Sequence, residues 1–205
     1  MEVPSSFDVV VSADGLAFYG ADFWSGEESV RLWEALSERV AWKQQSIRIF
    51  GRFVVQPRLT CWMGDDGVRY TYSGLTHDPE PWMPEVLQLK CALERTLAVS
   101  FNGVLLNLYR NGLDSMGWHR DNEMELGKEP VIASVSLGAT RRFLLRRYKS
   151  RDDQVSLQLG HGSVLVMAGA LQEFWEHSLP KVGKKTAMST DLRINLTFRK
   201  IIHQH

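Results

Sequence analysis

The chain has few of the features that mark several large classes of protein. It contains 2 cysteines in 205 residues, Cys61 and Cys91. Two cysteines cannot build a disulfide framework, and no C-x-x-C zinc pattern occurs. No apolar run approaches the roughly 18 residues that a membrane-spanning helix needs, and residues 1–12 lack a positively charged leader. We therefore expect a soluble globular protein of a reducing compartment, with no membrane partner: cytoplasmic, or nuclear in a eukaryote.

The net charge is zero at pH 7, which argues against a protein that binds nucleic acid through overall charge alone. The charge is unevenly distributed, however. The segment 141–151 contains six basic residues and no acidic one, and Lys181, Lys184 and Lys185 form a second basic cluster. Two interpretations stay open: basic runs are commonly solvated surface, or they form a rim that contacts phosphates.

The first hundred residues predict two helices separated by an extended segment. Ser25 and Glu28 have the spacing of a capping box, so a helix begins there. Apolar residues then recur at intervals of three or four, as one buried helical face requires. A second helix follows Pro84, since proline is tolerated at an early helical position. Between these helices, residues 46–73 are rich in β-branched and aromatic residues, with a turn at 64–67.

After about residue 100 the pattern changes to short strands. The apolar or alternating runs are 101–109, 131–137, 143–147, 155–159, 163–167 and 193–201, and residues 160–162 have the composition of a hairpin turn between two of them. This spacing predicts an α+β protein with a jelly-roll core, the double-stranded β-helix. We expect a single domain over 1–205. Residues 1–100 would supply helices and recognition hairpins, and residues 101–202 the catalytic core.

Two histidines and one aspartate are candidate ligands of a single metal ion. His119 and Asp121 are two positions apart, so in a strand both side chains would point to one face. His177, from a distant strand, is the natural third ligand. Two histidines and one carboxylate form the facial triad of non-haem Fe(II) oxygenases, which leaves positions open for a co-substrate and oxygen. The alternative is that His119 is an ordinary core or surface imidazole.

The last predicted strand carries polar residues on one face and apolar residues on the other. Arg193, Asn195, Thr197 and Arg199 alternate with Ile194, Leu196 and Phe198. Two arginines on a buried face need an anionic partner. A dicarboxylate such as 2-oxoglutarate offers two carboxylates, each suited to the planar fork of an arginine. The alternative is a pair of surface salt bridges.

Together these motifs resemble the AlkB family of nucleic-acid dealkylases, which depend on Fe(II) and 2-oxoglutarate. The resemblance covers about residues 45–202 and rests on His119-Arg120-Asp121, His177-Ser178-Leu179-Pro180, Asn107-Leu108-Tyr109, Ala133 to Gly138, His161-Gly162-Ser163 and the run Arg193 to Arg199. It implies that His119, Asp121 and His177 hold the iron.

The resemblance also implies a site for the co-substrate. Arg193, Asn107 and Tyr109 would bind the distal carboxylate of 2-oxoglutarate, and Asn195 and Arg199 its keto-acid end. With O2, the family chemistry converts 2-oxoglutarate to succinate and CO2, hydroxylates a carbon on a base nitrogen and releases formaldehyde.

Other residues resemble the branch of this family that acts on duplex DNA. Tyr70, Tyr72 and Ser73 resemble an aromatic pocket in which the tyrosine rings and His119 flank a flipped base. The alternative is that Tyr70 and Tyr72 are ordinary strand aromatics.

A second segment resembles the finger hairpin of that branch. Phe50 and Gly51 would form a wedge that fills the gap left by the base, and Arg52 and Arg58 would contact phosphates. A phenylalanine beside a glycine is also common in hairpins of other proteins.

The residues after the metal-binding aspartate carry one departure from that branch. Glu123 would contact the base edge, but Asn122 occupies a position where a second acidic residue is expected. An amide both donates and accepts hydrogen bonds, so the base preference can differ.

The leading hypothesis is a monomeric DNA dealkylase acting on 1-methyladenine and 3-methylcytosine in duplex DNA. One alternative keeps the chemistry and changes the target, as in an RNA demethylase or a protein hydroxylase. A second alternative is a non-catalytic nucleic-acid-binding module. A small-metabolite oxygenase is disfavoured because the hairpin aromatics and the basic clusters would lack a role.

Overall fold

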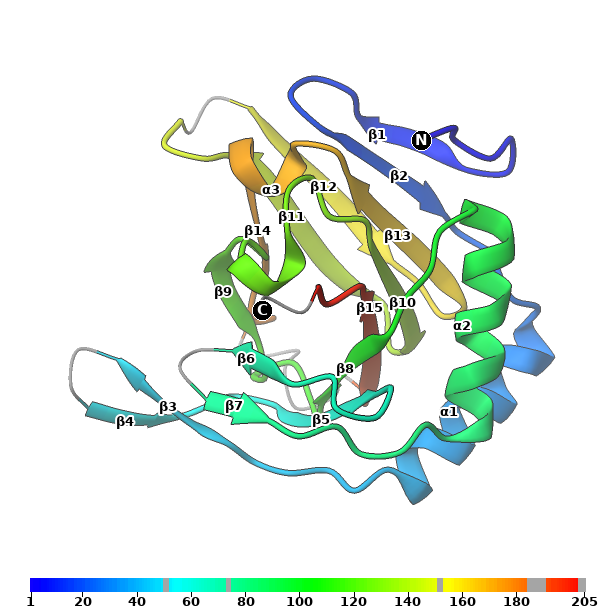
Figure 1. The fold of residues 1–205 in the computed structure, drawn as a ribbon, viewed down its shortest axis with the longest axis vertical. Helices are drawn as coiled ribbons and strands as arrows, with labels where there is room; N and C mark the ends of the chain where they lie inside the picture. Colours follow the sequence, from blue (N-terminus) through cyan, green and yellow to red (C-terminus); the bar gives the residue numbers. More distant parts are fainter. Residues whose placement is uncertain (50–51, 73–74, 151–152, 184–190, 203–205) are drawn as a thin grey trace.

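Two antiparallel sheets face each other in the protein, and two helices cover the outer face of the larger sheet (Figure 1). The computed structural model describes residues 1–49, 52–72, 75–150, 153–183 and 191–202. The larger sheet has the strand order β1 (Asp8–Val11), β2 (Leu16–Gly20), β13 (Ser163–Ala168), β10 (Ile132–Gly138), β15 (Arg193–Arg199), β8 (Gly103–Tyr109) and β5 (Leu59–Gly64). The smaller sheet has the order β12 (Gln154–Leu159), β11 (Arg141–Arg147), β14 (Trp175–Leu179) and β9 (Met116–His119). This is the expected jelly-roll arrangement.

The helices are α1 (Gly26–Arg39) and α2 (Pro84–Leu97). The predicted capping box is present: the Ser25 hydroxyl accepts from the backbone N–H of Glu28, and the Glu28 carboxylate accepts from the backbone N–H of Ser25. Leu36, Leu89 and Leu93 are fully buried against the larger sheet. Within the described residues, neither helix has the length and apolar character that a membrane crossing would require.

The central strands of the larger sheet separate the hydrophobic cluster under the helices from the space between the sheets, which holds a second hydrophobic cluster. Side chains alternate across a strand, so Ile194, Leu196 and Phe198 of β15 pack under the helices. Their neighbours Arg193 and Asn195 face the smaller sheet and are buried too. The predicted two-faced strand is confirmed, and its polar face lines an interior cavity.

Two hairpins and two short helical turns complete the described fold. The hairpin of β3 (Ser46–Ile49) and β4 (Arg52–Val55) pairs with no other strand of the described residues and projects away from the body of the protein (Figure 1). The hairpin of β6 (Tyr70–Tyr72) and β7 (Leu75–His77) forms a second two-stranded sheet. The short helices are η1 (Met124–Leu126) and α3 (Leu171–Phe174).

The connection at residues 160–162 differs from the prediction. It is not a hairpin, because β12 pairs with β11 in the smaller sheet whereas β13 pairs with β10 and β2 in the larger one. Gly162 has a left-handed φ of 79°, and a Cβ there would lie 2.5 Å from the hydroxyl of Ser29 in α1. A glycine at position 162 therefore allows the backbone to pass close to α1 where the chain crosses from the smaller sheet to the larger one.

The first hundred residues also supply three strands of the larger sheet, a contribution that the sequence did not predict. Strands β1, β2 and β5 belong to the seven-stranded sheet, in addition to the expected helices and hairpins. The first of these, β1, is a largely exposed edge strand, so it lacks the clean alternation of apolar and polar residues that identifies a strand in a sequence.

Candidate active site

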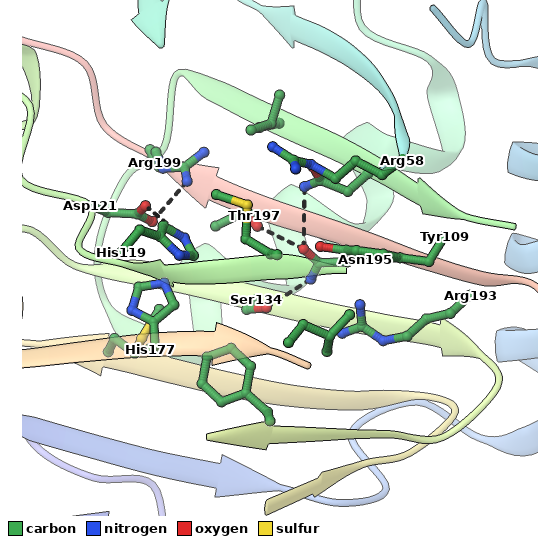
Figure 2. A pocket seen from close by; sticks show the side chains of 16 residues that line it. Arg58, Tyr109, His119, Asp121, Ser134, His177, Arg193, Asn195, Thr197 and Arg199 are labelled. Atoms are coloured by element: carbon green, nitrogen blue, oxygen red, sulfur yellow. Dashed lines mark hydrogen bonds and ion pairs between the residues drawn. The ribbon is translucent and has the colours of Figure 1, made fainter. Parts of the chain in front are cut away.

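The three predicted metal ligands meet between the sheets. His119 is the last residue of β9, and it lies directly opposite His177 on β14. Asp121 lies two residues beyond β9, so the irregular segment after the strand, and not strand alternation, directs its carboxylate towards the histidines. The available ligand atoms of the three residues all lie within 4.8 Å of one another. In Figure 2 their side chains converge at one end of the cavity.

Hydrogen bonds prepare both kinds of ligand for a metal ion. His119 Nδ1 lies 2.8 Å from the carbonyl oxygen of Gly117. A carbonyl oxygen only accepts, so Nδ1 carries the proton and Nε2 keeps a free lone pair. Arg199 Nη2 donates to Asp121 Oδ2 over 2.8 Å, whereas Asp121 Oδ1 has no hydrogen-bond partner among the described residues. His119 Nε2 and Asp121 Oδ1 are thus the atoms available to bind a metal ion.

Charge and burial set the protonation states of the site. Burial alone would raise the pKa of Asp121, but Arg199, together with the two imidazoles, holds it well below its ordinary value. Burial and the neighbouring His119 lower the pKa of His177 to about 3. Burial also lowers the pKa of His119, against the opposing effect of Asp121. An ionised carboxylate and two neutral imidazoles are the forms that bind a divalent metal.

The pKa of His177 predicts how the stability of the metal-free protein depends on pH. The unfolded chain takes up this proton below an ordinary pKa of 6.5, but the folded chain takes it up only near 3. The unfolded state therefore binds more protons in this range, and the free energy of unfolding falls as the pH decreases from 6.5 to 3. Each unit of the difference corresponds to about 1.4 kcal/mol.

Denaturant unfolding of chelator-treated protein at pH 7 and at pH 4.5 measures this effect. The variant His177→Gln should lose less free energy between these two pH values than the wild type. An equal loss in both proteins would contradict the assignment.

The opposite end of the cavity is suited to an anion. Arg193 pairs with Tyr109 across β15 and β8, and its Nη2 donates to the hydroxyl of Ser136 over 2.9 Å. Its Nε has no hydrogen-bond partner among the described side chains. Burial lowers the pKa of Arg193 to about 10, so the guanidinium stays charged at pH 7. A buried charge of this kind requires an anionic ligand.

A polar ladder connects the two ends of the cavity. Asn195 Nδ2 donates to Ser134 Oγ over 2.8 Å, and Asn195 Oδ1 accepts from Thr197 Oγ1 over 3.0 Å. Asn107 Nδ2 lies 3.4 Å from the same Asn195 oxygen. Arg199, at the metal end, leaves Nε and Nη1 without hydrogen-bond partners in the described part of the chain. The cavity therefore offers one arginine to each end of a dicarboxylate, with the metal ligands beside Arg199 (Figure 2).

Arg58 occupies a different place from the one predicted. We expected a phosphate contact at the surface, but Arg58 is 3% exposed and its Nε donates to Asn107 Oδ1 over 2.8 Å. A guanidinium buried in the cavity wall cannot reach the backbone of a duplex outside it. Its contact with Asn107 places it instead among the residues around the predicted co-substrate site (Figure 2).

Tyr70 lies beside the cavity, but its ring is fully buried. It stacks on Trp62 with ring centroids 4.8 Å apart, and Arg199 Cζ lies 5.3 Å from its centroid. Because the ring is fully buried, with Trp62 stacked on one of its faces, it presents no open surface to a flipped base in this structure. Glu123 is half-buried near Tyr70, and burial together with Asp121 raises its pKa. Glu123 thus lies beside the metal ligand Asp121.

Several predicted substrate residues fall partly or wholly outside the described structure. Phe50, Gly51 and Ser73 lie outside the described residues, and so does the side chain of Tyr72. Arg52 is exposed on the projecting hairpin, where a phosphate contact is sterically possible.

The basic run 141–151 is not a continuous rim for phosphates. Arg141 is buried and donates to the carbonyl oxygens of Asp114 and Pro180. Arg146 and Arg147 form ion pairs with Glu176 and Asp14. These three arginines stabilise the fold, because each already binds a carboxylate or carbonyl oxygen of the protein itself.

Sequence reasoning missed Ser134, Ser136 and Gln172. The two serines could have been predicted from the sequence, because they alternate with apolar residues along β10. They lie opposite polar residues of β15 and so belong to the same polar face. Gln172 could not have been predicted in this way, since a single glutamine in a four-residue helix belongs to no repeating pattern.

Comparison with known proteins agrees with this geometry. The model of the 2OG-Fe(II) oxygenase superfamily matches residues 17–199. The chain belongs to this superfamily.

Individual relatives belong to the AlkB group. The chain is 42% identical over 184 residues to the alpha-ketoglutarate-dependent dioxygenase alkB homolog 3 of Bos taurus, covering 85% of this chain and 62% of that protein. It is 36% identical over 200 residues to the DNA oxidative demethylase ALKBH2 of Mus musculus, covering 93% and 82%.

The solved structure titled "The structure of OsALKBH1" has a TM-score of 0.63 at 17% identity, covering 94% of this chain and 100% of that one, and this likeness concerns the fold alone. The chain spans about 60% of the length of the alkB homolog 3 proteins that it matches.

Proposed function

We propose that the protein repairs alkylated bases in DNA by oxidative dealkylation, with 1-methyladenine and 3-methylcytosine in duplex DNA as substrates. One observation carries the proposal: the His119, Asp121 and His177 cluster shares a cavity with two buried arginines whose N–H groups are partly unpaired. Similarity to relatives named as DNA oxidative demethylases supports DNA as the substrate.

When bound, Fe(II), 2-oxoglutarate and O2 supply the oxidation, in which 2-oxoglutarate becomes succinate and CO2 and the alkyl carbon on the base nitrogen is hydroxylated. The resulting hemiaminal releases formaldehyde from a methylated base. The chain's own residues hold the reactants. Gly117 keeps Nε2 of His119 free for the metal, and Arg199 keeps Asp121 ionised. Arg193 would bind the distal carboxylate of 2-oxoglutarate, with Asn107 and Tyr109 beside it.

The projecting β3–β4 hairpin supports a nucleic-acid substrate. Phe53 on β4 is 79% exposed, and the neighbouring Val55 is 56% exposed. Exposed apolar groups next to the basic Arg52 suit a surface that contacts bases and phosphates together. A single copy of the chain supplies all three metal ligands, so a monomer suffices for the reaction.

Formaldehyde release from a duplex that contains 3-methylcytosine tests the proposal, with Fe(II), 2-oxoglutarate and ascorbate present. We expect release that requires both Fe(II) and 2-oxoglutarate and that disappears in His119→Ala. Succinate production without formaldehyde, on this duplex and on one with 1-methyladenine, would refute the DNA proposal.

The same assay separates the alternatives. Methylated single-stranded DNA, methylated RNA and peptides are tested beside the duplex. A preference for RNA or peptide would indicate an RNA demethylase or a protein hydroxylase. Nucleic-acid binding without any succinate would indicate a non-catalytic module.

A further inference from the structure

The segment that carries two metal ligands is tied to α3, a short helix that supplies no ligand itself. The backbone N–H of Asp121 donates to Gln172 Oε1 over 2.9 Å. The intervening Arg120 donates from Nη1 to the carbonyl oxygen of Glu173 over 3.0 Å. Asp121 lies beyond the end of β9, so no strand ladder holds its backbone. The hydrogen bond that Asp121 donates to Gln172 takes the place of a ladder bond there.

The Gln172 amide has a defined orientation. Gln172 is 3% exposed, and its Nε2 lies 3.5 Å from the sulfur of Met167 on β13. A backbone N–H only donates, so the atom facing Asp121 must be the amide oxygen and not the nitrogen. The Met167 side chain lines the cavity. Gln172 therefore bridges Met167 of the larger sheet and the segment that carries Asp121, with its acceptor oxygen directed at the backbone of Asp121.

The helix that carries Gln172 is itself held in place by the N-terminal strands. Trp175 Nε1, directly after α3, donates to the carbonyl oxygen of Ala13 over 3.0 Å. In the same β1–β2 turn, Gly15 has φ +129°, and a Cβ there would lie 2.5 Å from Cα of Leu171. The turn thus packs against the backbone of α3, and this contact limits how far Gln172 can move.

We propose that Gln172 is a positioning residue for the metal site: its side-chain oxygen fixes the backbone of Asp121 so that the carboxylate meets both histidines. The inference rests on the metal-binding role of the triad and not on DNA as substrate. Loss of such an outer hydrogen bond commonly weakens metal binding about 10–100-fold. Removal of the acceptor also leaves a buried N–H without a partner.

Titration of the apoprotein with Mn²⁺ alone, followed by the electron paramagnetic resonance signal of the free ion, tests the proposal. Gln172→Leu should raise the Kd for Mn²⁺ about 10–100-fold. Gln172→Glu keeps an acceptor oxygen at the same distance and should restore most of the affinity. Glu173→Ala is the matched control, because the Glu173 side chain is exposed and only its backbone carbonyl is used. It should bind Mn²⁺ as the wild type does.

Two results would overturn the proposal. One is a wild-type Kd in Gln172→Leu. The other is a Gln172→Glu variant as weak as Gln172→Leu while both apoproteins keep the wild-type Tm. If Gln172→Leu does not fold, Gln172→Met replaces it under the same criteria, because methionine is unbranched and of similar length. The titration contains no DNA, so a failure of the proposed DNA substrate leaves its outcome unaffected.

Discussion

Replacing Asp121 with alanine is expected to abolish the conversion of 2-oxoglutarate to succinate. The variant removes the one anionic metal ligand and leaves two neutral imidazoles, so the loss should exceed the 10–100-fold that an outer hydrogen bond is worth. It also leaves the guanidinium of Arg199, whose side chain is 4% exposed, without its carboxylate. Breaking a buried ion pair from one side costs about 3–5 kcal/mol of stability. Succinate formation and denaturant unfolding of the apoprotein measure the two effects.

Asp121→Asn separates these effects. The amide keeps the volume and can still accept a hydrogen bond from Arg199, so stability should fall less than in Asp121→Ala. Metal binding should fail in both variants, since the negative charge is lost in each. Mn²⁺ affinity near the wild-type value in Asp121→Asn would exclude Asp121 as a metal ligand.

Replacing Arg193 with methionine is expected to raise the KM for 2-oxoglutarate by two to three orders of magnitude. Removing one partner of a buried, hydrogen-bonded charge pair costs about 2–5 kcal/mol, and each 1.4 kcal/mol is tenfold in affinity. The Kd for Mn²⁺ should stay unchanged, because Arg193 lies at the end of the cavity away from the metal ligands (Figure 2).

A keto acid without the distal carboxylate provides the decisive comparison for Arg193. The wild type should strongly prefer 2-oxoglutarate to 2-oxobutyrate, and Arg193→Met should lose most of this preference. Arg142→Met is the matched control, because Arg142 is exposed on β11. A preference that survives in Arg193→Met would place the distal carboxylate elsewhere.

The parts of the site that the sequence predicts are those with a strict period or spacing. The last strand alternates every second residue, so Arg193, Asn195 and Arg199 had to share a face once the strand formed. His119 and Asp121 were identified as neighbours by their spacing. However, strand alternation is not what brings them together, because β9 ends at His119.

The features that the sequence did not predict depend on contacts between distant segments. Nothing local distinguishes Arg58, whose partner Asn107 is 49 residues away, from a surface arginine. The glycines at 160 and 162 have the composition of a hairpin, but whether two strands pair depends on the sheet that each one joins. The connection there crosses between sheets instead.

The separation of the site residues along the chain has a consequence for folding kinetics. Asp121 meets Arg199 across 78 residues and Gln172 across 51. Long-range pairings of this kind form slowly, because loop-closure entropy is lost before the contacts are gained. We therefore expect the ligands to converge only after β15 has joined β8 and β10. Iron would then be captured at the end of folding, so its concentration would determine how much of the protein is loaded and not how fast the chain folds.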